Sequence, residues 1–148
     1  MKAAAVLMLL LAGCPDAKVK SRSTTTNSRT LATASERSAF LCGYLVCPTM
    51  PSDAVFDIDF HDNSGFPPGP SDLDLHAVVK MTPDQTELWV RGCTQEQLEA
   101  RPEWLRPLLT QRPEWAPKSA PDTYTCGFGQ KRLVHVKEGL VMVQLELH

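Results

Sequence analysis

The 148-residue sequence has no apolar run long enough to cross a bilayer as a helix. Such a helix needs about 20 consecutive apolar residues. The apolar run from Ala3 to Ala12 has ten. This segment is therefore too short to be a permanent membrane-spanning anchor.

The sequence also has no catalytic signature. It contains no Gly-x-Ser-x-Gly elbow, no glycine loop that could cradle phosphates and no Cys-x-x-Cys redox motif. Its basic residues are not concentrated in one stretch, as nucleic-acid binding normally requires. We therefore expect a binding domain with no cofactor and no nucleic-acid partner.

The N-terminus has the features of an export signal. Lys2 supplies a positive charge ahead of the apolar run, which ends in Leu11-Ala12-Gly13-Cys14. This ending resembles the lipobox of bacterial lipoproteins. The resemblance implies a signal peptide over 1–13, acylation of Cys14 and attachment to the inner or the outer membrane on its extracytoplasmic side. The alternative is an ordinary signal peptide in which Cys14 is incidental.

Cysteine number supports an oxidising compartment. Once the lipid site is set aside, four cysteines are left, which are Cys42, Cys47, Cys93 and Cys126. Four suits two disulfides, and three connectivities are open. On one strand or one helix, Cys42 and Cys47 would point to different sides, so a direct bond between them requires a turn, which Gly43 permits. We expect instead that each of the two reaches across the domain, to Cys93 or Cys126. A four-cysteine zinc site is the alternative, but Cys93 and Cys126 are isolated in the sequence.

Composition divides the rest of the chain into a tether and one domain. Residues 14–38 include a Ser- and Thr-rich stretch, carry several basic residues and contain no aromatic residue, which predicts a flexible tether. Aromatic residues begin at Phe40, so the globular domain is predicted over 39–148.

Hydrophobic alternation predicts the main strands of that domain. Apolar and polar residues alternate over 56–61 and again over 72–81, and the sequences 131–137 and 140–147 read as a final hairpin around Glu138-Gly139. The loop over 62–71 is too long and proline-rich for a tight turn. We predict an α+β fold with an antiparallel sheet of about four or five strands, stabilised by disulfides.

Helices are predicted to be few and short. Residues 39–47 are ambiguous between helix and strand. Thr82-Pro83-Asp84-Gln85 has the pattern of a capped helix start that would end at Gly92. A similar pattern at Thr94 predicts a second helical stretch through Leu98. Prolines at 102, 107 and 113 restrict the next part of the chain to short turns.

The middle of the chain is acidic. Between Pro48 and Cys93 there are eight acidic residues against two basic ones. We predict a binding surface there, formed by Asp57, Asp59, His61, Asp62, Asn63, Asp72 and Asp74 together with the proline-rich loop over 62–71. Such a surface fits a cationic envelope protein. Inhibitors of cationic lysozymes are one example of small disulfide-bonded envelope proteins, an analogy of size and charge only.

Other chemistry is conceivable for the same segment. A hydrolase or divalent-metal enzyme would be centred on His61, Asp62 and Asp72. Calcium could use the oxygen ligands of Asp57, Asp59, Asp62, Asn63 and Asp72. A transition metal could join His61 to His76 and His135, if the strands bring these histidines together.

The motif Arg-Pro-Glu-Trp occurs twice, at 101–104 and 112–115. We expect Trp104 and Trp115 to lie over the domain as apolar lids. A clamp for an aromatic ligand is the alternative.

Overall fold

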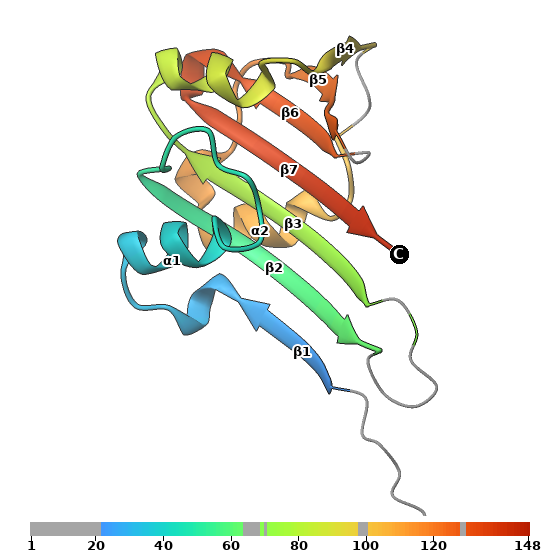
Figure 1. Ribbon diagram of the computed structural model, residues 1–148. Helices are drawn as coiled ribbons and strands as arrows, with labels where there is room; N and C mark the ends of the chain where they lie inside the picture. Colours follow the sequence, from blue (N-terminus) through green and yellow to red (C-terminus); the bar gives the residue numbers. More distant parts are fainter. Residues whose placement is uncertain (1–21, 64–68, 70, 98–100, 128–129) are drawn as a thin grey trace, which may run out of the picture.

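The computed structural model describes residues 22–63, 69, 71–97, 101–127 and 130–148. They form one antiparallel sheet of seven strands in the order β1-β2-β3-β7-β6-β5-β4 (Figure 1). The strands are β1 (Arg22–Asn27), β2 (Asp53–Asp62), β3 (Asp72–Lys80), β4 (Thr94–Glu96), β5 (Asp122–Thr125), β6 (Lys131–His135) and β7 (Leu140–Leu147). The α+β class is confirmed, but the sheet has more strands than the sequence predicts.

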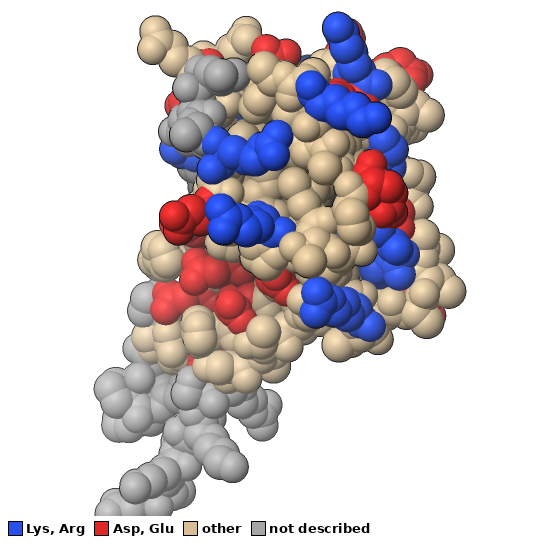
Figure 2. All heavy atoms as spheres, turned by 180° about the vertical axis from the view of Figure 1, so that it is seen from behind, with Lys and Arg blue, Asp and Glu red and all other residues tan. Residues whose placement is uncertain are grey.

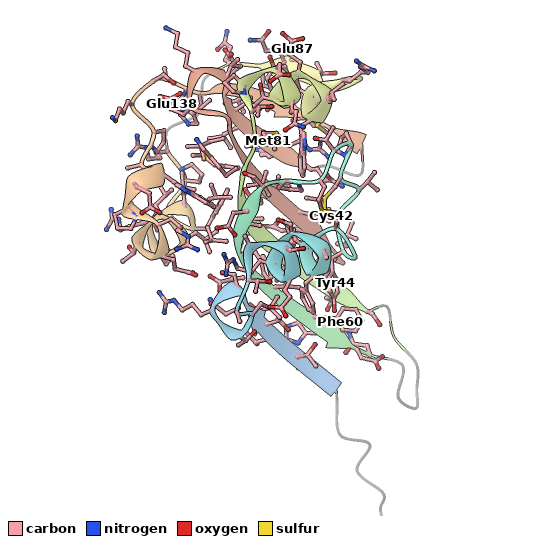
Figure 3. All side chains as sticks on the ribbon, turned by 90° about the vertical axis from the view of Figure 1, so that its left-hand side faces the viewer. Cys42, Tyr44, Phe60, Met81, Glu87 and Glu138 are labelled. Carbon is pink, nitrogen blue, oxygen red and sulfur yellow. A yellow bond between two sulfur atoms is a disulfide. The ribbon has the colours of Figure 1, made fainter. Side chains whose placement is uncertain are left out.

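Short helices cover both faces of this sheet. Helix α1 (Ala34–Leu41) lies on the front face in Figure 1 and α2 (Leu105–Gln111) lies on the back, and Figure 3 shows the two on opposite sides of the sheet. They are accompanied by the 3-10 turns η1 (Ser28–Thr30), η2 (Pro83–Val90), η3 (Pro113–Trp115) and η5 (Val136–Glu138). In α1, Thr33 and Glu36 form a reciprocal capping box, which satisfies two free amides of the first turn.

Strand alternation divides the core into two parts. The front core includes Phe56 of β2, Leu75 of β3 and Val143 of β7, packed with Leu41 of α1 and Trp89 of η2. The back core contains the opposite set of strand residues, which pack under α2. These are Val55, Val78, Leu133, Leu140 and Met142, together with Leu105, Leu108 and Trp115. The back core therefore covers only the part of that face beneath α2.

The predicted tether is wrong for residues 22–38. Strand β1 pairs antiparallel with β2, from Arg22 opposite Asp62 to Asn27 opposite Asp57, and α1 begins at Ala34. The segment buries few apolar side chains, so composition alone suggested disorder. Its Thr residues nevertheless suit a strand, because the β-branched side chain packs well on a pleated surface.

The predicted helical stretch from Thr94 is also wrong. Thr94–Glu96 forms the edge strand β4, paired with β5. The first capping pattern does start a helical segment, because the Thr82 amide donates to the side-chain Oε1 of Gln85 at 3.3 Å and η2 follows. The predicted hairpin around Glu138-Gly139 is confirmed as β6 and β7.

Two disulfides form, with a different connectivity from the expected one. Cys42 bonds Cys47 and Cys93 bonds Cys126. The turn after α1 reverses the chain, which brings Cys42 and Cys47 to a Cα separation of 5.5 Å. Both sulfurs of each pair are thus consumed, and the zinc interpretation is wrong. The bond across 33 residues stabilises the fold by about 4 kcal/mol in a loop-entropy model, and the bond across five by about 2 kcal/mol.

One glycine joins the β6–β7 turn to the segment after β3. Gly139 has φ of +62°, and its carbonyl accepts a 2.9 Å hydrogen bond from the Met81 amide. A Cβ on Gly139 would lie 2.1 Å from the Met81 carbonyl oxygen. Met81 and Glu138 mark this junction in Figure 3.

We predict that Gly139→Ala destabilises the protein by at least about 2 kcal/mol, because the side chain is excluded both by the left-handed backbone and by the Met81 carbonyl. Gly92→Ala is the matched control. Gly92 has φ of +78°, but a Cβ on it would meet no atom within 4 Å. The control should therefore cost only about 1 kcal/mol. Urea unfolding midpoints measure both, and equal losses would contradict the steric argument.

Candidate binding face

Five carboxylates lie together on the back of the sheet, below the area that α2 covers. We call this group the acidic face: Asp57, Asp59, Asp72, Asp74 and Glu146. In the strand register, Asp59 of β2 is opposite Asp74 of β3, and Asp74 is opposite Glu146 of β7. Neighbouring strands are about 4.8 Å apart, so three carboxylates form one row across three strands.

The two adjacent rows complete the face. On one side, Asp57 is opposite His76, which is opposite Gln144. On the other side, His61 is opposite Asp72. Alternation places all of these side chains on the same face, because each lies two residues along its strand from a member of the central row. Figure 2 shows acidic side chains gathered in the lower part of this side of the molecule.

One cation lies near this group, because Lys131 of β6 is opposite Gln144, in the row next to Asp59, Asp74 and Glu146. None of the five forms an ion pair with a lysine or arginine in the described part of the chain, where both ion pairs lie at Asp53. Their contacts are with neutral groups, since Asn27 donates to Asp57 and Asn63 donates to Asp72 at 3.4 Å. The buried Oδ1 atom of Asp74 has no hydrogen-bond partner among the described residues.

His76 does not offset this negative charge. Burial lowers the pKa of His76, although the carboxylates of Glu146, Asp74, Asp57 and Asp59 act in the opposite direction. The net direction is downward from the ordinary value near 6.5, so the imidazole is neutral at pH 7. With five carboxylates, a neutral imidazole and the single lysine Lys131, the face keeps a net negative charge.

Trp104 forms the border between the acidic face and the back core. Its ring stacks on His76 with centroids 4.8 Å apart, and its indole Nε1 donates to Gln144 at 3.2 Å. Gln144 in turn donates to Glu146 at 2.6 Å. This chain of contacts fixes the orientation of the side chains along the upper edge of the face.

The structure brings together six of the seven side chains predicted as the binding surface. Asp57, Asp59, His61, Asp72 and Asp74 share one face, and Asn63 follows the end of β2 and contacts Asp72. Asp62 is opposite Arg22 and lies on the other face of the sheet, because adjacent strand residues point to opposite sides. Glu146 is absent from the predicted set, although alternation along 140–147 aligns it with the polar positions of that strand.

The enzyme arrangement does not converge. His61 is exposed, and its Nδ1 atom shares a 2.8 Å hydrogen bond with the Ser23 hydroxyl. Asp72 is opposite His61 in the register of β2 and β3. Asp62, the third member of the predicted centre, projects from the opposite face. The predicted catalytic group is therefore divided between two sides of the sheet.

The metal hypotheses gain no support from the geometry. Among the residues that the structure describes, no group of three or more His, Cys, Asp or Glu side chains is arranged to hold a metal ion. His135 is buried and lies 3.4 Å from the Ser119 hydroxyl, on the part of the sheet where β6 meets β7. His61 is opposite Asp72, near the far end of β2.

The two tryptophans have different environments. Trp115 is 8% exposed and belongs to the back core, with Arg112 above its ring at 5.8 Å. Trp104 stacks on His76 at the border of the acidic face. Both cover apolar surface, as the lid interpretation expects, and Trp104 already has an aromatic partner in His76.

Comparison with protein-family models, curated proteins and solved structures gives no match. No helix in the described ranges is long and apolar enough to span a membrane. Cys14 and the rest of the lipobox lie outside the described residues, and so do 64–68 and 70 of the proline-rich loop that the sequence predicts as part of the binding surface.

Removing one carboxylate of the central row should stabilise the fold. Like charges directly opposite each other on a sheet are destabilising, by roughly 0.2 to 1 kcal/mol per pair. We expect Asp59→Asn and Asp74→Asn to raise the urea midpoint at low salt, and the gain should shrink at high salt because ions screen the repulsion. Asp122→Asn makes the same change in β5 outside the face and should give no such gain. Loss of stability in both variants, independent of salt, would contradict the repulsion.

Proposed function

We propose that this protein is a lipid-anchored, non-enzymatic binding domain of the cell envelope, which presents its acidic face to a cationic partner protein. The observation that carries the proposal is the row of Asp59, Asp74 and Glu146. These three carboxylates stand opposite one another without a described cationic partner. The repulsion within the row lowers the stability of the free protein, and a bound cationic surface would relieve it.

The shape of the site favours a protein partner over a small molecule. The carboxylates lie on one surface of a sheet, in rows separated by about 7 Å along each strand. A lysine- and arginine-rich surface could contact several of them at once. Charge complementarity of this kind mainly accelerates association and selects the partner, and both effects weaken with added salt.

The anchor would set the position of the acidic face. Seven residues separate Cys14 from Arg22, where the described chain begins. Fully extended, they span roughly 25 Å. Lys18 and Lys20 in this segment would add a modest attraction to anionic lipid, about 1 kcal/mol per charge close to the surface. Arg22 is opposite Asp62 at the end of β2 that also carries Asp59 and His61, so this end of the sheet follows directly after the tether, while anionic lipid would repel the acidic face toward a cationic partner.

A cationic lysozyme serves as the binding probe. We expect it to bind the wild-type protein with an affinity that falls steeply between low and physiological salt. The double variant Asp59→Asn/Asp74→Asn should bind at least about tenfold more weakly, because two of the five carboxylates are removed. Calorimetry measures both. Asp122→Asn should bind as the wild type does, and equal affinity for the double variant would contradict the proposed face.

The anchor is tested separately. Replacing Cys14 by Ser removes the only thiol at the lipobox, so we expect loss of acyl labelling and release of the protein from the membrane fraction. Intact-mass measurement of the natural protein should show an acylated N-terminal Cys14. Cys42→Ser/Cys47→Ser is the control for general loss of a cysteine pair and should leave acylation intact. Unmodified Cys14 in the natural protein would contradict the anchor.

A further inference from the structure

A second polar site lies at the other end of β2, where residues of α1 and of α2 approach the same strand. A cavity of about 270 Å³ is lined by Ser28, Arg29, Leu31, Arg37, Val55, Gln111 and Arg112. Ser28 and Arg29 belong to η1, and Leu31 follows it. Arg37 belongs to α1 and Val55 to β2. Gln111 is the last residue of α2, and Arg112 follows that helix. Arg29 and Arg37, which are near each other in the sequence, thus meet the distant Arg112 around one cavity.

One carboxylate in this region is shared by two of the arginines. Asp53 accepts from Arg37 at 2.8 Å and contacts Arg112 at 3.2 Å, and its Oδ1 atom also accepts the Ala54 amide at 2.8 Å. Another guanidinium nitrogen of Arg37 donates to the carbonyls of Leu31 and Ala32. Arg37 is therefore held by Asp53 and by two backbone carbonyls, and it forms a fixed part of the cavity wall.

The polar groups left available around the cavity are hydrogen-bond donors. Arg112 uses one terminal nitrogen for Asp53, which leaves its other guanidinium nitrogens without a hydrogen bond in the described structure. Gln111 accepts from the Ser28 hydroxyl at 2.9 Å through its carbonyl oxygen, so its amide nitrogen is free to donate. The exposed guanidinium of Arg29 has no partner among the described residues.

The local charge has the same sign. Three guanidinium groups and one carboxylate give a net charge of +2 around the cavity. This positive charge lies at one end of β2, and the acidic face lies at the other end of the same strand. Leu31 and Val55 give the cavity an apolar portion beside its charged groups.

We propose that this cavity binds a small soluble oxyanion, either a phosphate or a carboxylate group, through Arg112, Gln111 and Arg29. The guanidinium fork matches the two oxygens of such a group, and Arg37 positions Arg112 indirectly through the shared Asp53. The volume is slightly below the range of about 300 to 1,000 Å³ that accommodates drug-sized ligands. The ligand is therefore a small anion or the anionic end of a larger molecule. This site is independent of the acidic face.

Calorimetric titration of the purified full-length protein with inorganic phosphate, and separately with acetate, tests the proposal. Sodium chloride at equal ionic strength is the reference. We expect saturable one-to-one binding of at least one of the two anions. Arg29→Gln and Gln111→Glu should each weaken it at least about tenfold, the first by removing an exposed cation and the second by adding a negative charge beside Arg112.

Matched variants separate this site from general charge effects. Arg91→Gln removes an exposed arginine that does not line the cavity and should bind as the wild type does. Asp59→Asn/Asp74→Asn should also leave anion binding unchanged, so failure of the acidic-face proposal and failure of this one are distinguishable. Circular dichroism and urea midpoints show whether Arg29→Gln and Gln111→Glu are folded.

Three results would overturn the site. The first is the absence of saturable binding of both anions to the wild-type protein. The second is equal binding by wild type, Arg29→Gln and Gln111→Glu. The third is binding to phosphatidylglycerol vesicles but not to free phosphate, because the occupant would then be a lipid headgroup at a membrane surface rather than a soluble anion.

Discussion

The register of β3 between β2 and β7 determines both what the protein buries and what it displays. Because strand side chains alternate, placing Leu75 and Val143 in the front core also places Asp74, Asp59 and Glu146 in one row on the back. A slip of one residue would bury these carboxylates and expose the core. The large free energy of burying the front core therefore holds in place a charge row that would not form by its own interactions.

The back of the sheet divides along the strands into two environments. Beneath α2 it is apolar, with Val78 and Met142 fully buried. Past Trp104 it becomes polar and acidic, and the stack of Trp104 on the neutral His76 marks the change. Protonation of His76 would reduce the negative charge of the face. Because the pKa of His76 is lowered, this protonation requires a more acidic solution than that of an ordinary histidine.

The sequence predicts the elements whose pattern is local and strongly periodic. Alternation identifies β2, β3 and the β6–β7 hairpin, and the side of β2 that carries Asp57, Asp59 and His61 follows from the same alternation. The edge strands escape prediction because their evidence is tertiary. β1 has little to bury, and β4 has a sequence that also suits a helix start, so each is decided by the strand beside it. The arginine cavity joins Arg29, Arg37 and Arg112 from three separate segments, and no local pattern could have indicated it.

The contrast between the two ends of β2 bears on how the acidic face should be interpreted. Asp53, Asp57 and Asp59 point to the same side of one strand. Asp53 is contacted by two guanidinium groups, whereas Asp57 and Asp59 have no described lysine or arginine within ion-pair distance. The chain thus has arginines near this strand, and the fold directs them to Asp53 and the cavity. Asp57 and Asp59, at the other end of β2, therefore keep their negative charge because the fold places these arginines elsewhere. This arrangement gives β2 a positive and a negative end, which would orient a cationic partner before contact.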